Sequence, residues 1–164
     1  MVYIMKFMVD GGCRGNGQSW AFGAAAACMM SRNGSYWTRT RRLDTDDYDA
    51  TNQRAEILAI ILALEWALEK HGNLDLNPDV DVTIYSDSAY AVKCMTTWIY
   101  KWASNGWTNA RGYDVANQDL LQEASDLDDA VQELGTVNYV HIPRRYNQEA
   151  DEACNDVLDE MQYD

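Results

Sequence analysis

Four acidic residues occupy positions at which a carboxylate could do chemistry. Asp10 follows the first apolar run of the chain, and Asp87 follows a short β-rich segment. Glu56 lies inside an apolar helical run, where a carboxylate is costly unless it is paired or binds a metal. Asp151 opens the last helical segment. Because carboxylate oxygens are the ligands that Mg²⁺ prefers, these four residues could together hold a divalent cation.

Each of these carboxylates also has an ordinary structural explanation. Asp10 precedes a glycine and could form a turn. Glu56 shares its helix with Glu65 and could be partly solvated. Asp87 could cap the helix that follows it, and Asp151 would interact favourably with the dipole of its own helix. Residue type alone therefore leaves both explanations open at every position.

The elements that must position these residues follow from the apolar pattern. The first 43 residues predict three strands, at 2–10, 21–30 and 36–43, with turn chemistry at 11–17 and an Asn-Gly hairpin turn at 33–34. A long and largely buried helix is predicted over 51–70, with Thr51 or Asn52 as its cap. The remaining predicted elements are a strand at 81–85, helical segments near 89–95 and 97–104, a helix at 115–134, a strand at 137–142 and a helix at 148–161.

This order of elements predicts an α/β sheet that is antiparallel in its first half. Open sheets of this class bind ligands at the carboxyl ends of their strands, which is where Asp87 is expected. A length of 164 residues suits one compact domain. No apolar run is long enough to span a membrane, and the N-terminus resembles a strand more than a signal peptide.

Composition argues against a polyanionic ligand. The formal net charge is −13, whereas proteins that bind phosphate backbones are usually basic. Such acidity is typical of a surface that keeps a protein soluble or of a protein from a saline habitat. A cluster of cation-binding carboxylates would make a second, smaller contribution. The four cysteines are scattered and form no CxxC pair, so reduced thiols in an intracellular protein are expected. A hypothesis that the protein binds a polyanion must therefore rest on sequence motifs strong enough to outweigh the negative net charge.

Four ordered blocks of sequence, taken together, resemble the type 1 class of ribonuclease H. The resemblance extends from Met5 to about Leu158, and the tryptophan-rich segment around 98–117 is similar to the protruding handle of that family. The four blocks are residues 10–17, residues 51–56, residues 85–88, and the set formed by His141, Asn147 and Asp151.

The resemblance implies a ribonuclease-H-like fold, with a mixed five-stranded sheet of three antiparallel strands and then two parallel ones, flanked by helices. It implies one catalytic domain over residues 1–164, with the handle at about 95–117 and no separate hybrid-binding domain. The implied activity is endonucleolytic cleavage of the RNA strand of RNA–DNA hybrids by a monomer, leaving a 5′-phosphate and a 3′-hydroxyl.

The implied catalytic site contains two Mg²⁺ ions, for which Mn²⁺ could substitute. Asp10 would bridge both ions, Glu56 and Asp87 would complete one site, and Asp151 would complete the other. His141 would act in proton transfer or product release, although an exposed histidine is more often an ordinary surface residue.

The resemblance also assigns substrate contacts. Amide side chains would read 2′-hydroxyls in the minor groove, and a phosphate pocket with an aromatic platform would hold the DNA strand. Alternatively, the amides cap helices and form turns, and at least one tryptophan only holds the handle together. The residues assigned to substrate binding are Asn16, Thr51, Asn52, Gln53, Trp98, Trp102, Asn117 and Asn147.

Two departures from the family pattern weaken the expected grip on phosphate. Asp49 stands where related eukaryotic enzymes carry an arginine, and the handle region has only Lys93, Lys101 and Arg111. Weak binding with a shallow salt dependence is therefore expected. Two other functions remain open: a catalytically weak or inactive hybrid-binding module, and an integrase-like or resolvase-like nuclease of the same fold.

Overall fold

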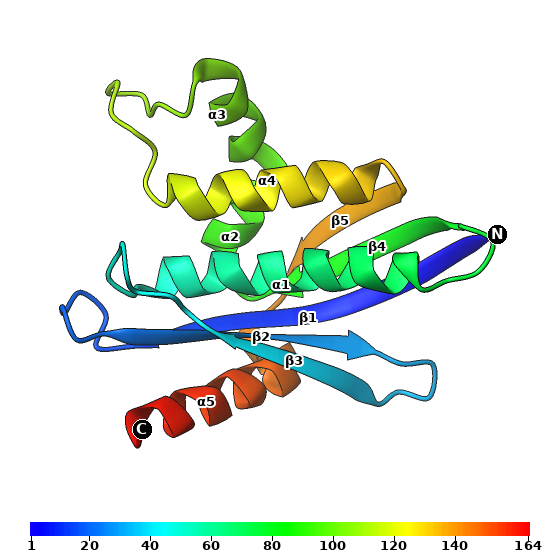
Figure 1. The fold of residues 1–164 in the computed structure, drawn as a ribbon, viewed down its shortest axis with the longest axis horizontal. Coiled ribbons are helices and arrows are strands. Elements are labelled where there is room, and N and C mark those ends of the chain that lie inside the picture. The colour runs from blue at the N-terminus through cyan, green and yellow to red at the C-terminus, as the bar shows by residue number, and fades with distance from the viewer.

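The structure is a computed structural model that describes residues 1–164, and it is built around one mixed five-stranded sheet (Figure 1). The strand order is β3-β2-β1-β4-β5. β1 pairs antiparallel with β2, and β2 pairs antiparallel with β3, while β1, β4 and β5 run parallel. The expected sheet is therefore confirmed. The strands are β1 (Val2–Arg14), β2 (Phe22–Met30), β3 (Tyr36–Arg42), β4 (Asp79–Ser86) and β5 (Gly135–His141).

Helices cover both faces of this sheet. α1 and α4 lie on one side and α5 lies on the other (Figure 1). The helices are α1 (Asn52–Gly72), α2 (Ala89–Lys93), α3 (Ile99–Asn105), α4 (Gln118–Gln132) and α5 (Gln148–Gln162). α2 and α3 are joined by one wide helical turn, Cys94–Trp98, where the sequence predicts two separate segments. None of these helices is both long and apolar enough to cross a bilayer.

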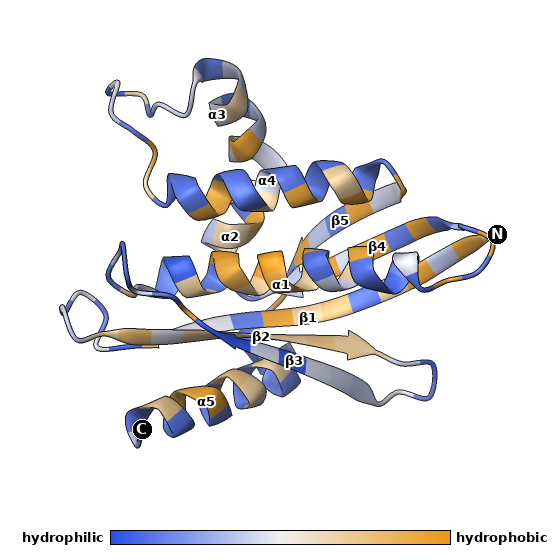
Figure 2. Ribbon diagram, viewed as in Figure 1, coloured by the Kyte–Doolittle hydropathy of each residue, from blue (hydrophilic) through white to orange (hydrophobic).

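The apolar pattern of the sequence builds two layers of core. Met5, Phe7 and Val9 alternate along β1 and pack with the buried side of α1, where the Phe7 and Trp66 rings lie 5.6 Å apart. A smaller cluster fills the space between β2 and α5. Figure 2 shows hydrophobic residues along α1 and the central strands, while α4 and α5 alternate between the two colours. The sheet is therefore held firmly between its helices.

The first strand is longer than expected. β1 runs to Arg14 and pairs with β2 through the segment predicted as a turn, so Asp10 lies within the strand and does not end it. Gly11 is needed here for a close approach, because a Cβ atom at this position would lie 2.2 Å from the carbonyl carbon and oxygen of Ala55. The parallel pairing with β4 ends at Val9, so Asp10 is the first residue of β1 beyond β4.

Helix α4 starts later than predicted, and the structure decides which of two candidate residues caps α1. α4 begins at Gln118 and not at residue 115, because Asn117 has a left-handed φ of 62° that cannot continue a helix. α1 begins as expected, and Thr51 is its cap: the side-chain oxygen accepts a hydrogen bond from the backbone N–H of Arg54. The side chain of Asn52 is therefore not needed for capping.

Replacing Gly11 with alanine should destabilise the protein by at least about 3 kcal/mol, because the new methyl group overlaps the backbone of α1. Gly72→Ala is the matched control, since a Cβ there meets nothing within 4 Å, and its effect should stay below about 1 kcal/mol. Urea unfolding measures both changes. Equal midpoints for Gly11→Ala and the parent protein would contradict the close approach.

Candidate metal and nucleic-acid site

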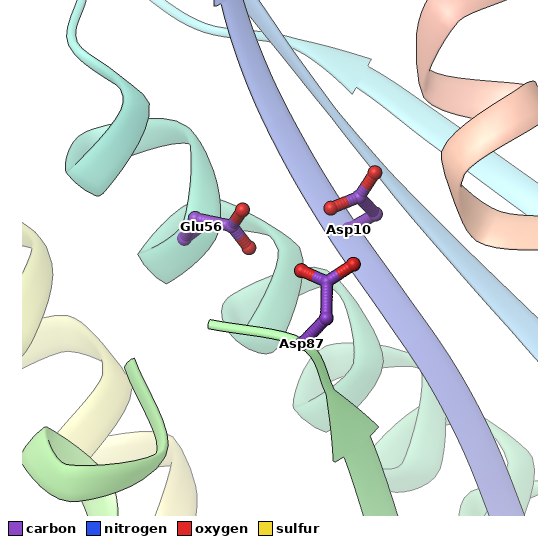
Figure 3. Close-up of side chains that lie close together, drawn as sticks. All are labelled: Asp10, Glu56 and Asp87. Carbon is purple, nitrogen blue, oxygen red and sulfur yellow. The ribbon is translucent and has the colours of Figure 1, made fainter. Parts of the chain in front are cut away.

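Three carboxylates from three different elements meet beside the end of β4. Asp10 comes from β1, Glu56 from α1 and Asp87 from the loop after β4, and one ligand oxygen from each lies within 4.8 Å of the others. Figure 3 shows the three side chains pointing toward one another. Asp10 is only 6% exposed, while Glu56 and Asp87 are half-buried. The sequence placed these residues on separate elements, and the fold brings them together.

Local hydrogen bonds free these carboxylates from ordinary structural roles. Ser88, and not Asp87, caps α2, because its side chain accepts a hydrogen bond from the N–H of Ala91 at 3.1 Å. Glu56 accepts a hydrogen bond from the N–H of Gly11 at 3.3 Å. The close approach of α1 to β1 therefore also orients the Glu56 carboxylate.

Burial and neighbouring charges raise the pKa values of two of these carboxylates, Asp10 and Glu56. Burial, followed by the negative charge of Asp87 and by the hydrogen bond and charge of Asp151, raises the pKa of Asp10 to about 8. Burial, followed by the charges of Asp10 and Asp87, raises the pKa of Glu56 to about 9. Without a cation, ionisation of this cluster is therefore strongly opposed.

Asp151 lies at the edge of the cluster. It belongs to the first turn of α5 and lines the same cavity of about 390 Å³ as the other three carboxylates, but it is not part of the 4.8 Å group. The guanidinium of Arg144 lies 3.5 Å from the Asp151 carboxylate, and the Arg144 side chain is 80% exposed. Its positive charge offsets part of the rise in the pKa of Asp10. Sequence reasoning gave Arg144 no role, although an Arg-Arg pair shortly before an acidic residue was visible.

Asn147 corrects one expectation. It was assigned to substrate binding, but it is fully buried and cannot touch a substrate in this structure. Its amide nitrogen donates to the carbonyl oxygen of Val9 at 2.8 Å and to the Asp87 carboxylate at 3.4 Å. Asn147 therefore links the start of α5 to β1 and to the acidic cluster.

His141 stands beside the cluster because β5 pairs with β4. The pairing places His141 opposite Ser86, and its Nε2 atom lies 3.2 Å from the carbonyl oxygen of Asp87, to which it can donate. The residue is exposed. Its ring is therefore both near the acidic cavity and accessible to solvent.

The residues expected to contact the substrate in the minor groove and in the phosphate pocket separate into two groups. Asn16 accepts a hydrogen bond from the backbone N–H of Asn52 at 2.9 Å, and Asn52 lines the acidic cavity. Asn117 donates to Gln53 at 3.4 Å and to the hydroxyl of Tyr90 at 3.0 Å. Thr51 precedes this second group at the cap of α1. Tyr90 had no assigned role, because no motif in the sequence singles it out.

The handle tryptophans form a chain of neighbouring rings. The ring centroids of Trp98 and Trp102 are 5.7 Å apart, and those of Trp102 and Trp107 are 6.3 Å apart. Trp107 is buried and adopts a left-handed φ of 63°, so it belongs to the interior of the handle. Trp98 and Trp102 are only half-buried and present part of their surface to solvent.

This arrangement suits a divalent cation with hard oxygen ligands. Three carboxylates converge here, and a cation bound between them would stabilise their ionised forms; neither histidine nor thiol is among them. Cys154 lines the cavity, but burial raises the pKa of its thiol to about 12, so it stays protonated. The donor set therefore fits Mg²⁺ or Mn²⁺ better than Zn²⁺.

The sequence and the fold of this chain are similar to those of one family of known proteins. A family model described as RNase H matches residues 3–159. Ribonuclease H of Francisella philomiragia is 32% identical over 154 residues, covering 93% of this chain and 89% of that protein. Ribonuclease H of Jannaschia sp. (strain CCS1) is 36% identical over 147 residues, covering 87% and 83%. The fold is similar to the crystal structure of LC11-RNase H1 in complex with RNA/DNA hybrid, with a TM-score of 0.66, 23% identity, and coverage of 96% and 99%. Since the matches span nearly the whole sequence, the chain belongs to the ribonuclease H family.

Proposed function

We propose that this protein is an endonuclease that hydrolyses the RNA strand of RNA–DNA hybrids, leaving a 5′-phosphate and a 3′-hydroxyl. The observation that carries the proposal is the meeting of Asp10, Glu56 and Asp87 in a chain of the ribonuclease H family. A protein of the same fold, LC11-RNase H1, has been crystallised with an RNA/DNA hybrid. Residues 1–164 would act as one catalytic domain and as a monomer inside the cell, where the four free thiols fit a reducing compartment.

Two Mg²⁺ ions, replaceable by Mn²⁺, would be held by the acidic residues. Asp10 would serve both sites, Glu56 and Asp87 would complete one, and Asp151 would complete the other. Divalent cations at such a site supply charge neutralisation of the phosphate and activation of water. The position of Asp151 at the edge of the 4.8 Å group supports its separate assignment.

The other polar residues would orient the substrate and move protons. Arg144 places an exposed positive charge at the acidic cavity, where it offsets part of the repulsion between the carboxylates and the phosphate backbone. Because its Nε2 can donate to the carbonyl oxygen of Asp87, His141 would carry a proton at its other ring nitrogen, Nδ1, to or from the reacting phosphate, or assist release of the product. Its exposure and its closeness to Asp87 support both roles.

Selection of the hybrid would depend on both strands. Asn16, Asn52 and Gln53 would contact 2′-hydroxyls and base edges, since amides both donate and accept hydrogen bonds. Thr51 and Asn117 would bind a phosphate of the DNA strand. Their proximity through Gln53 and Tyr90 supports a common pocket. The exposed parts of Trp98 and Trp102 would contact deoxyribose.

With Mg²⁺, the protein should cut the RNA of a labelled RNA–DNA duplex and leave RNA–RNA, DNA–DNA and single strands intact. Asp10→Asn should abolish cutting, because it removes the carboxylate shared by both metal sites. Asp79→Asn, at the far end of β4, is the matched control and should keep full activity. Binding without cutting in Mg²⁺ and Mn²⁺ would favour a hybrid-binding module. Cutting of DNA duplexes would favour an integrase-like nuclease.

The acidic cluster should also make stability depend on pH and metal. Asp10 and Glu56 have raised pKa values in the folded state, so the unfolded chain releases these protons first as pH rises from about 4. The metal-free protein should therefore lose stability up to about pH 9. At pH 8 in EDTA, Asp10→Asn should be more stable than the parent protein by roughly 1–3 kcal/mol.

Thermal unfolding of both proteins in EDTA and in MgCl₂ measures this effect. The difference between the parent protein and Asp10→Asn separates the contribution of the acidic cluster from that of the other acidic residues. Mg²⁺ should raise the melting temperature of the parent protein at pH 8 more than at pH 5, and Asp10→Asn should lose most of that gain. Parallel pH profiles for the two metal-free proteins would contradict the repulsion described above.

His141→Ala should slow turnover by about 10²-fold without abolishing it, as expected for loss of a proton-transfer group. Single-turnover and steady-state rates with the hybrid distinguish the two assigned roles. A defect in both rates indicates proton transfer, and a defect in the steady-state rate alone indicates product release. Unchanged rates would show that His141 is an ordinary surface histidine.

A further inference from the structure

The turn between β1 and β2 carries a large aromatic side chain that no motif of the family explains. Trp20 is 65% exposed, although an exposed indole leaves much apolar surface in water. A single exposed apolar residue needs no explanation by itself. Three features of the surrounding turn point to a role for Trp20: its conformation, its position and its charge.

The backbone holds the indole ring in place. Two successive turns, with hydrogen bonds from Gln18 N–H to Gly15 oxygen at 2.9 Å and from Ala21 N–H to Gln18 oxygen at 3.1 Å, fold Trp20 back over Gly15. Gly15 has a φ of 74°, and a Cβ atom there would lie 2.4 Å from the ring. One part of the ring is therefore packed on the backbone, while the rest faces solvent in a defined orientation.

This turn lies beside the acidic cavity. Asn16, within the turn, accepts a hydrogen bond from the backbone of Asn52, and Arg14 and Asn52 both line the cavity. Figure 1 shows the β1–β2 turn at the same end of the molecule as the start of α1. Trp20 belongs to the same turn as Asn16, so a duplex that contacts Asn16 would pass close to Trp20.

The local charges do not favour phosphate binding at this place. Arg14 is held by Asp159 at 2.7 Å and by Gln162 at 2.6 Å. Arg42, at the end of β3, is paired with Asp164. In a protein of net charge −13, apolar surface at this place would add a contact with a nucleic acid that needs no positive charge. Aromatic side chains supply such contact with sugars and bases, and this contact depends little on salt.

We propose that Trp20 is a substrate-contact residue, which holds the RNA–DNA hybrid through apolar contact with sugars and base edges beside Asn16. The wide and shallow minor groove of an A-like duplex exposes these surfaces. The contact compensates for phosphate contacts that this acidic protein lacks. The inference rests on the proposed function, since it concerns the same substrate.

Trp20→Ala should raise the KM for the hybrid by about 5- to 100-fold and leave kcat unchanged. The fold-change should be the same at low and high KCl, because no ion pair is lost. Trp37→Ala is the matched control: Trp37 is 60% exposed but lies on β3 next to the β2–β3 hairpin, at the opposite end of the sheet (Figure 1). Its KM and kcat should equal those of the parent protein.

A second variant separates contact from loop structure. Trp20→Phe keeps an aromatic ring and should retain most of the affinity, but the change in tryptophan fluorescence on adding hybrid should become smaller than in the parent protein. An unchanged KM in Trp20→Ala, or an unchanged fluorescence response in Trp20→Phe, would overturn the inference alone. Failure of the parent protein to bind the hybrid would overturn the proposed function together with it.

Discussion

Helix α1 and strand β1 approach each other at Gly11 so closely that a single methyl group would not fit between them. This contact packs the carbonyl group of Ala55 against β1. It therefore places Glu56 next to Asp10, the residue before Gly11. The N–H of Gly11 also donates to the Glu56 carboxylate. The geometry of the acidic cluster thus depends on a position that has no side chain of its own.

The cluster places like charges together in a half-buried cavity, which the fold must oppose with other interactions. The large core between α1 and the sheet keeps the two elements in contact, and Asn147 links Asp87, β1 and the start of α5. Arg144 adds a compensating charge beside Asp151. These supports lie on different elements, so the folded scaffold as a whole holds the carboxylates in place before any cation binds.

The order of the elements and the acidic positions could be predicted from the sequence, because both depend on local patterns. Glu56 was conspicuous as a carboxylate within an apolar helix. The extension of β1 past Asp10 could not be predicted, since Gly11 and its neighbouring glycine are typical of a turn until β2 and α1 are placed beside them. The burial of Asn147 likewise results from the packing of α5 on the sheet. Its place in the sequence, four residues before Asp151, does not indicate that packing.

The negative net charge of this protein opposes binding of a polyanionic substrate, and the distribution of side chains determines how the two can be reconciled. Several arginines are already paired with acidic side chains, as Arg39 is with Glu69 and Arg41 with Glu65. The 26 acidic residues also outnumber the 13 lysines and arginines, so the net charge does not attract a duplex from a distance. Under the proposed function, recognition would depend more on short-range contacts from amides and aromatic rings, which neutralise no phosphate and therefore depend little on salt. An acidic member of this family can thus bind a polyanion only through a well-shaped surface, and for that reason the placement of individual aromatic residues matters more here than in a basic relative.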